Sequence, residues 1–284
     1  MSDTLTIALP SKGRMERPAT ELLRQAGFRF ERTERSLAVP VRDAPIELLF
    51  VRSSDVVELV ADGAADLGIT GLDLTRETSA PVTPVLDLGF GRCTLVAAAP
   101  ENSGVDRIED FAGLRVATSH PTVVGSFFAS KSIDIVPVPL AGSVEVAPRL
   151  DVADAVADLV STGSTMLVNG LRPVAEILQS QAILIHRDSS PLSDTARTVT
   201  TMIEAALAAR RKRYVVMNAD EESVPAIAEI IPGIEAPTVL PLVANGKVAV
   251  HSVVDESDVW RVLPLLREAG ATGILVLPVQ QVLA

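Results

Sequence analysis

Short apolar runs alternate with longer amphipathic stretches along the first part of the chain, and this pattern predicts strands that alternate with helices. The first series comprises a strand at Leu5–Leu9, a loop at Pro10–Gly13, a helix from about Met15 to Ala26, a strand at Ile46–Val51 and a helix at Ser54–Asp62. Strands joined in this way by helices are expected to form a parallel sheet.

The same order of elements recurs from residue 114, and both series end in the motif Asp-Leu-x-x-Thr-Gly, which begins at Asp66 and at Asp158. The second series comprises a strand at Leu114–Thr118, a loop at Ser119–Thr122, a helix to about Lys131, a strand at Ile135–Val138, a helix opened by Ser143 and a strand at Ala155–Val160. Either the chain contains two similar lobes, or short apolar and polar strings resemble each other by chance. Two α/β lobes with right-handed crossovers would bring four loops, at the carboxyl ends of strands, around one ligand cleft.

Two segments connect the predicted lobes. The stretch from Thr75 to Pro100 is punctuated by proline and glycine and contains a β-rich run at Cys93–Ala98, as expected of a crossover. A short strand at Ala182–His186 and a long helix at Asp194–Arg213 would return the chain to the first lobe. The basic end of this helix, Arg210–Arg213, could bind an anion, but cations in a last helical turn more simply complement the helix dipole.

From Tyr214 onward the pattern changes to the order βαββαβ, which is typical of a ferredoxin-like domain. The predicted elements are strands at Tyr214–Ala219, Thr238–Val243, Lys247–Val254 and Ile274–Val279, with helices at Ser223–Ile231 and Ser257–Ala269. The pair Asn245-Gly246 between two apolar runs predicts a hairpin with a type I′ turn. We therefore expect residues 1–92 and 183–213 to form one lobe, residues 93–182 the other, and residues 214–284 a separate domain for sensing or assembly.

Composition limits the class of protein. With 48% hydrophobic and 21% charged residues, the 284-residue chain is typical of a globular protein of two or three domains. No apolar run approaches the roughly 20 residues that a membrane helix needs, and the N-terminus lacks a secretory leader, so we expect a cytoplasmic protein. The net charge of −11 argues against nucleic acid as the main partner. Neither a disulfide framework nor a zinc site is expected, because Cys93 stands alone and the histidines, His120, His186 and His251, are scattered.

A candidate phosphate site follows the strand Ala155–Val160. The loop Thr162-Gly163-Ser164-Thr165 precedes a helix predicted from Thr165 to about Leu178, so it offers hydroxyls, unpaired N–H groups and the positive end of a helix dipole. Asp158, just before the loop, would repel a phosphate but could accept hydrogen bonds from sugar hydroxyls. The loop together with Asp158 indicates a site for a sugar phosphate. The alternative is an ordinary helix start capped by a hydroxyl group.

Several spaced motifs resemble those of ATP phosphoribosyltransferase, the first enzyme of histidine biosynthesis. They are Pro10–Gly13, Asp66–Asp73, Gly142–Glu145 and Asp158–Met166, with Pro232–Thr238 and Gly273–Val276 matching the long form of the family. The resemblance implies a two-lobed, periplasmic-binding-protein-like catalytic body with a C-terminal ferredoxin-like regulatory domain. Asp151 departs from the glycine usual in the family, and Asp is one of the few residues that tolerate positive φ at such a position.

The resemblance also implies the reaction and its residues. A pentosyltransferase of this family joins N1 of the adenine of ATP to C1 of the ribose of phosphoribosyl pyrophosphate, with Mg²⁺ held mainly by the substrate phosphates. Thr162, Gly163, Ser164 and Thr165 would cradle the 5-phosphate, and Glu145 and Asp158 would hold the ribose hydroxyls. The cations nearest the first lobe's loops are Lys12, Arg14 beside Gly13, and Arg52, which we assign to the pyrophosphate and nucleotide phosphates. Asp73 is either a nucleotide or metal contact or a helix N-cap, and His120 could stack on adenine.

The C-terminal domain resembles the histidine-sensing module of the long family members. This implies feedback inhibition by histidine, inhibition by AMP, and a homo-oligomer between dimer and hexamer. Its candidate histidine contacts are Asp220, Thr238, Ser252, Val253 and Gly273. The alternative for this domain is a role in assembly only, and the alternative for the whole chain is a non-catalytic, two-lobed small-ligand-binding or sensor protein.

Overall fold

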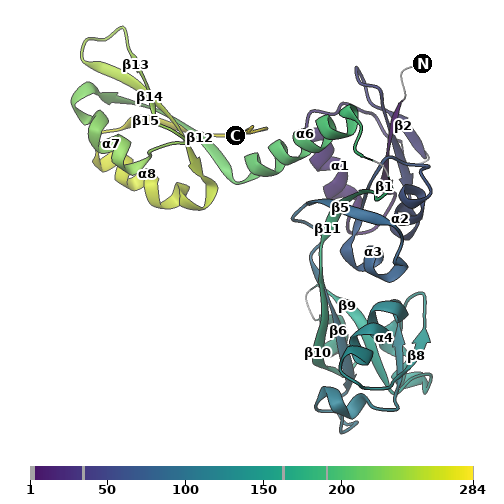
Figure 1. Cartoon of the computed structure of the whole chain (residues 1–284). Helices are drawn as coiled ribbons and strands as arrows, with labels where there is room; N and C mark the ends of the chain where they lie inside the picture. The colour runs from purple at the N-terminus through teal and green to yellow at the C-terminus, as the bar shows by residue number, and fades with distance from the viewer. Residues whose placement is uncertain (1–3, 34–35, 162–163, 190, 284) are drawn as a thin grey trace. The chain divides into compact units, whose positions relative to one another are not determined.

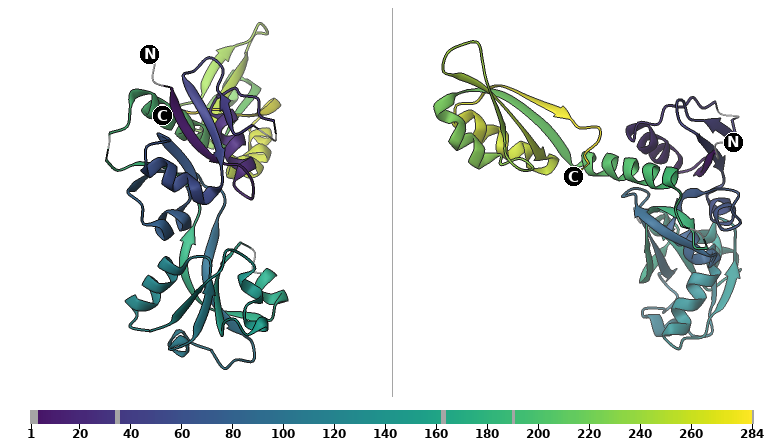
Figure 2. Two further views of the ribbon diagram at one scale, coloured as in Figure 1. Left: turned by 90° about the vertical axis from the view of Figure 1, so that its right-hand side faces the viewer. Right: turned by 45° about the horizontal axis from the view of Figure 1, so that its top comes forward.

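The computed structural model describes residues 4–33, 36–161, 164–189 and 191–283. The chain divides into two compact units, Met1–Glu21 with Arg29–Thr198, and Leu22–Phe28 with Val199–Ala284. The first unit contains sheets A and B and the second contains sheet C (Figure 1; Figure 2 gives two further views). No helix of the described residues is long and apolar enough to cross a membrane. Our finer division into two lobes and a C-terminal domain stays a prediction.

Sheet A has the strand order β2-β3-β1-β4-β11-β5. Its strands are β1 (Leu5–Pro10), β2 (Ala38–Pro40), β3 (Ile46–Val51), β4 (Leu67–Gly71), β5 (Val82–Asp87) and β11 (Ala182–Arg187), and the helices in this part are α1 (Glu16–Gln25), α2 (Ser53–Ala61) and α3 (Leu72–Thr78). β1 runs parallel to β3 and β4, and β11 runs antiparallel to β4 and β5. Val56, Val57 and Val60 share one face of α2 and form a buried cluster with Ala8 and Ile183. The strands and helices predicted here are confirmed. β2, β4 and β5 were not predicted as strands, and α3 was implied only by the helix N-cap alternative for Asp73.

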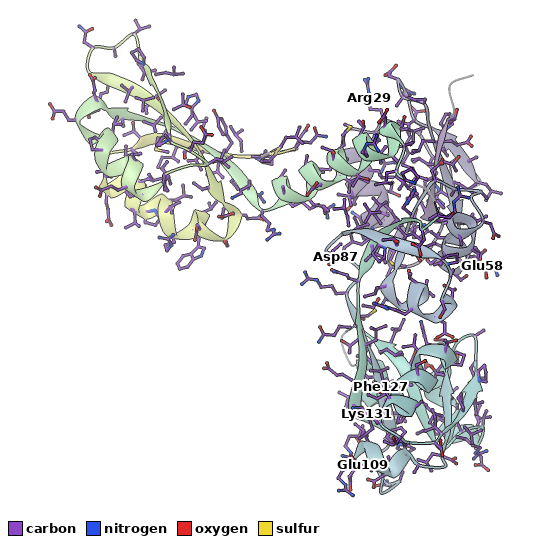
Figure 3. The ribbon with its side chains drawn as sticks, viewed as in Figure 1. Arg29, Glu58, Asp87, Glu109, Phe127 and Lys131 are labelled. Carbon is purple, nitrogen blue, oxygen red and sulfur yellow. The ribbon has the colours of Figure 1, made fainter. Side chains whose placement is uncertain are left out.

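Sheet B has the strand order β10-β6-β9-β7-β8. Its strands are β6 (Cys93–Pro100), β7 (Arg115–Thr118), β8 (Val136–Pro139), β9 (Ala155–Val160) and β10 (Leu171–Ser180), and α4 (Pro121–Ser130) follows β7. β7 pairs in parallel with β8 and β9, whereas β6 pairs antiparallel with β9 and β10. Phe128 of α4 packs on Phe111 with ring centroids 5.2 Å apart, and both are fully buried. Beside them, the ammonium of Lys131 lies over the ring of Phe127 (Figure 3).

Two helix predictions in this part of the chain are wrong. The helix expected from Thr165 to about Leu178 is α5 (Ser164–Val168), which ends before Gly170, where φ is 66°, and the chain then enters β10. The helix opened by Ser143 is instead two 3₁₀ turns, Val144–Val146 and Pro148–Leu150. Pro148 cannot donate a helical hydrogen bond, and Asp151 then turns the chain with φ of 56°. Asp151 thus adopts the positive φ that Asp is one of the few residues to tolerate.

The second unit carries the ferredoxin-like fold that the sequence predicts. Sheet C has the order β13-β14-β12-β15, and its neighbouring strands pair antiparallel. Its elements are β12 (Lys212–Asp220), α7 (Val224–Ile230), β13 (Thr238–Pro241), β14 (Lys247–Asp255), α8 (Val259–Glu268) and β15 (Thr272–Pro278), after the long helix α6 (Asp194–Arg210). The β13–β14 hairpin is confirmed, but the type I′ turn is wrong because only Gly246 of the Asn-Gly pair has positive φ.

Candidate functional site

The predicted site residues of the first unit follow the carboxyl ends of strands. Lys12, Gly13 and Arg14 follow β1, Arg52 follows β3, Asp73 follows β4, His120 follows β7, and Asp158 lies near the end of β9. Lys12, Arg14 and Arg52 are exposed, and Gly13 has φ of 84°, which suits glycine in the turn after β1. Ligands of parallel α/β sheets bind at this end of the strands. Position in the fold therefore supports the predicted loops as a candidate site.

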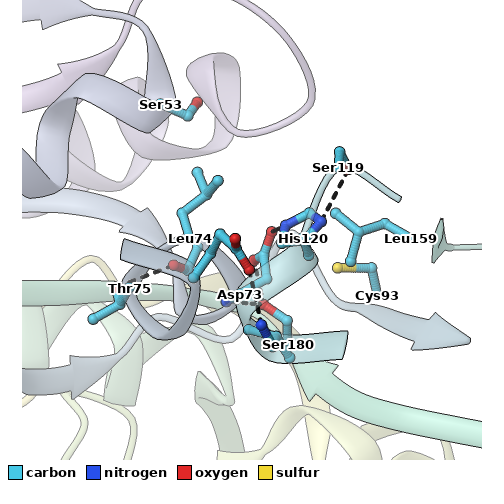
Figure 4. Close-up of polar contacts among 12 residues, drawn as sticks. Ser53, Asp73, Leu74, Thr75, Cys93, Ser119, His120, Leu159 and Ser180 are labelled. Carbon is cyan, nitrogen blue, oxygen red and sulfur yellow. Dashed lines mark hydrogen bonds and ion pairs between the residues drawn. The ribbon is translucent and has the colours of Figure 1, made fainter. Parts of the chain in front are cut away.

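Asp73 lies at the centre of a buried polar network (Figure 4). Ser180 Oγ donates to Asp73 Oδ1 at 2.5 Å, and the N–H of Asp73 donates to the same hydroxyl at 3.0 Å. His120 Nε2 lies 3.3 Å from Asp73 Oδ2, and His120 Nδ1 lies 2.9 Å from Ser119 Oγ. Burial raises the pKa of Asp73, but the contacts with His120 and Ser180 outweigh it, so the net shift is downward and Asp73 stays ionised.

The network bears on two predictions, the helix N-cap alternative for Asp73 and the stacking of His120 on adenine. Gly71 holds the N-cap position of α3, so the helix N-cap alternative for Asp73 is wrong. Only 3% of His120 is exposed, and both of its ring nitrogens have polar neighbours. Stacking on adenine therefore requires the ring to leave this position.

Asp158 has the opposite electrostatic environment. Burial raises its pKa, Glu145 raises it further, and the N–H of Leu159 and the nearby His120 only partly oppose the rise. These influences place Glu145 and His120 near Asp158. The assignment of Glu145 and Asp158 to the ribose hydroxyls stays a prediction, and the proximity of His120 to them was not predicted. Thr162 and Gly163 lie outside the described residues, as do the side chains of Ser164 and Thr165. Helix α5 begins at Ser164, within the predicted loop.

A cavity of about 550 Å³ lies where the chain passes between sheets A and B. It is lined by Leu72, Asp87, Arg92, Cys93, Thr94, Val160, Ser161, Gln179, Ser180 and Gln181. The guanidinium of Arg14 donates to Cys93 Sγ at 2.9 Å, although burial still raises the pKa of the thiol above its ordinary value. Ser180, Arg92 and Gln179 were not predicted from the sequence, because no local motif marks them and they meet only through the fold.

The predicted histidine contacts of the second unit do not all share one face of sheet C. Asp220 is exposed and pairs with Lys247 at 2.7 Å, whereas Ser252 is 4% exposed and its Oγ donates to the carbonyl of Ile231. Thr238, at the start of β13, lies opposite His251, and Val253 lies opposite Tyr214. Gly273 has φ of 57° beside an irregularity in the pairing of β12 with β15. Successive side chains of β12 and β14 point to opposite faces of the sheet, and the more buried residues alternate with the more exposed ones. Ser252 lies on the buried face and Asp220 on the opposite face.

Comparison with known proteins covers the whole length of the chain. Residues 52–207 match the family described as ATP phosphoribosyltransferase, and residues 209–281 match its C-terminal domain family. The chain is 41% identical to an ATP phosphoribosyltransferase of Natronomonas pharaonis, over 98% of this chain and 99% of the relative. A relative of the same name from Methanopyrus kandleri is 40% identical over the same shares.

Solved structures agree with the fold. An ATP phosphoribosyl transferase (HisG:HisZ) complex from Thermotoga maritima is similar with a TM-score of 0.60 and 28% identity, over 70% of this chain and 98% of that one. A protein called Tv2483, bound to L-arginine, is similar with a TM-score of 0.50 and 13% identity, over 72% of this chain and 83% of that one, which shows the fold alone. The predicted fold class is confirmed.

Proposed function

The chain belongs to the ATP phosphoribosyltransferase family, which catalyses the first step of histidine biosynthesis, and from this premise we propose how its residues serve the transfer. The reaction joins N1 of adenine to C1 of the ribose and releases pyrophosphate. Adenine N1 is itself the nucleophile and pyrophosphate leaves as an anion, so no protein nucleophile or general base is needed. The protein has to hold two polyanions in line and stabilise the positive charge that develops at C1.

The proximity of Glu145 to Asp158, shown by its effect on the Asp158 pKa, carries this proposal. The loop Thr162–Thr165, which we assign to the 5-phosphate, follows directly after β9, so a ribose with its phosphate in this loop would bring its hydroxyls near both carboxylates. The hydroxyls donate hydrogen bonds to Asp158 and Glu145. The same negative charge stabilises the oxocarbenium-like ring as the bond to pyrophosphate breaks.

Cations on the sheet A loops would hold the anionic ends of the substrates. Lys12 and Arg14 after β1, and Arg52 after β3, are exposed side chains at the carboxyl edge of the sheet. We assign them to the departing pyrophosphate and to the phosphates of ATP, with Gly13 allowing the backbone turn between Lys12 and Arg14.

Mg²⁺ would arrive bound to the phosphates of the substrate. The part of the chain that the structure describes has no group of three or more His, Cys, Asp or Glu side chains that could hold a metal ion. Mg²⁺ commonly binds one or two carboxylates together with substrate phosphates. The Glu145–Asp158 pair fits such partial ligation, whereas Asp73 is already held by Ser180 and His120.

Regulation is assigned to residues 214–284. Histidine would bind there and inhibit the transfer, and AMP would compete because it shares the adenine and a phosphate with ATP. A homo-oligomer between dimer and hexamer would couple these domains to the catalytic loops. A role of this domain in assembly alone is the alternative, and unchanged inhibition after substitution of its candidate contacts would favour it.

Formation of phosphoribosyl-ATP tests the function. Purified protein with ATP, phosphoribosyl pyrophosphate and Mg²⁺ should give the absorbance of the product, and omission of any one of the three should abolish it. Absence of product under all conditions would leave the non-catalytic, ligand-binding alternative standing.

A further inference from the structure

Helix α3 presents two carboxylates to the first turn of α4. Asp73 and Glu77 are four residues apart and therefore lie on the same face of α3. Asp73 contacts His120, which holds the N-cap position of α4, and Glu77 accepts hydrogen bonds from the first turn of the same helix. Because α3 follows β4 of sheet A and α4 follows β7 of sheet B, this contact joins the two sheets.

The N-terminus of α4 depends on Glu77 for its cap. His120 provides no side-chain cap, and Pro121 has no N–H to donate. The next two N–H groups donate to the two oxygens of Glu77, from Thr122 to Oε1 at 2.9 Å and from Val123 to Oε2 at 3.0 Å. A carboxylate at free N–H groups and at the positive end of a helix dipole is a favourable pairing. The cap of a sheet B helix is thus supplied from sheet A.

Ser180 fixes the second carboxylate where the chain crosses between the sheets. Its hydroxyl donates to Asp73 Oδ1 and accepts from the N–H of Asp73, and 5% of Ser180 is exposed. Ser180 ends β10 opposite Cys93 at the start of β6, and β11 of sheet A begins two residues later. The Asp73 carboxylate is therefore held from the N-cap residue of α4 and from the crossing strand.

We propose that Glu77 and Ser180 are positioning residues, which hold α3 against α4 and so set the spacing between the substrate loops of sheets A and B. The proposal rests on the proposed function, since the phosphate-binding cations lie on sheet A loops and the ribose-binding carboxylates lie on sheet B. A transfer between two bound substrates needs the two sets of groups at one fixed distance, whereas binding of a single substrate needs only its own set. Loss of either residue should therefore lower turnover more than it weakens the binding of one substrate.

The first test uses Glu77→Gln, with Glu58→Gln as the matched control. Glu58 is an exposed carboxylate on α2 (Figure 3) and lies outside the contact between α3 and α4. In Glu77→Gln, the amides of Thr122 and Val123 should exchange hydrogen at least tenfold faster than in the wild type, and the control should leave them unchanged. The kcat should fall at least fivefold, while the calorimetric Kd for phosphoribosyl pyrophosphate changes less than twofold.

The second test uses Ser180→Ala and Ser180→Thr, with the exposed Ser130→Ala as control. In Ser180→Ala, kcat should again fall at least fivefold while the Kd for phosphoribosyl pyrophosphate changes less than twofold. Ser180→Thr keeps the hydroxyl, so its kcat should lie within twofold of the wild type. If Ser180→Ala fails to fold, Glu77→Gln still tests the proposal, because Glu77 is partly exposed and its substitution perturbs the core less. If the wild type is active and Glu77→Gln has the same kcat, the positioning role is overturned. It is also overturned if the Kd of the variant for phosphoribosyl pyrophosphate weakens in proportion to the fall in kcat. Failure of the wild type to form product would defeat the proposed function instead.

Discussion

Replacement of Asp158 by Asn should lower turnover without lowering stability. A hydrogen bond to a charged acceptor contributes about 1.5–3 kcal/mol, which corresponds to roughly 10- to 150-fold in rate if it acts in the transition state. Asn keeps one acceptor oxygen but loses the negative charge, so we expect turnover to fall at least tenfold. The assay is steady-state formation of phosphoribosyl-ATP at saturating substrates.

The stability of the same variant should move in the other direction. Burial raises the pKa of Asp158 in the folded protein, so the folded state favours the protonated acid more than the unfolded chain does. Ionised Asp158 therefore costs stability once the pH exceeds its unfolded pKa of about 3.9, and this cost is complete above the raised folded pKa. Asn is uncharged at every pH, so the melting temperature at pH 7 should be unchanged or higher.

Asp134→Asn is the matched control, because Asp134 is exposed in the segment between α4 and β8. It should leave both turnover and melting temperature at wild-type values. Unchanged turnover in Asp158→Asn would remove Asp158 from the reaction. A fall in melting temperature of more than about 4 °C, which corresponds to at least about 1 kcal/mol in a protein of this size, would make the carboxylate a stabilising structural group.

Three further substitutions test other parts of the proposal. Asp73→Asn should lower the melting temperature at pH 7, by the equivalent of about 1.5–3 kcal/mol, because it weakens charged hydrogen bonds in a buried site. Folding lowers the pKa of Asp73, so ionised Asp73 stabilises the fold above about pH 4, and this stabilisation is lost as the pH falls through the folded pKa. The melting temperature of the variant should therefore fall less than that of the wild type when the pH is lowered. Thr165→Val should weaken calorimetric binding of phosphoribosyl pyrophosphate by about one to two orders of magnitude and that of ATP much less; equal losses would contradict the loop assignment. Asp220→Ala should keep catalysis without histidine but need at least tenfold more histidine for half inhibition, and an unchanged inhibition curve and histidine affinity would remove Asp220 from that site.

Secondary structure was predictable where burial repeats regularly within one element. The residues of Ile46–Val51 alternate between buried and partly buried, and the valines of α2 share one helical face, so each element is recognisable from its own residues. β10 was not recognisable, because two irregularities in its pairing with β6, at Pro173/Ala175 and Glu176/Leu178, break the alternation. Its apolar residues then recur at helical spacing, and the strand is specified by β6 rather than by the local pattern.

The same distinction applies to the site. Local sequence was enough to propose Asp158, because it stands just before the Thr162–Thr165 loop. Glu145 was proposed through the family resemblance, and the structure places it near enough to raise the pKa of Asp158. Ser180 lies 107 residues after Asp73, and Thr122 lies 45 residues after Glu77, so neither contact has a local signature. The burial of His120 also depends on α3, which the sequence indicated only through the helix N-cap alternative for Asp73.

The two central carboxylates illustrate how one fold can give the same chemical group two roles. Asp73 has a lowered pKa because its charge is already matched by Ser180 and His120, so little of that charge is left for a substrate. Asp158 has a raised pKa because burial and Glu145 are only partly balanced by the Leu159 N–H and His120, so its negative charge gains most from new partners. Ribose hydroxyls, Mg²⁺ and a cationic C1 are such partners, and each would stabilise ionised Asp158 as the substrate binds and reacts. These opposite environments support our proposal that Asp73 serves the architecture between the sheets and Asp158 the reacting sugar.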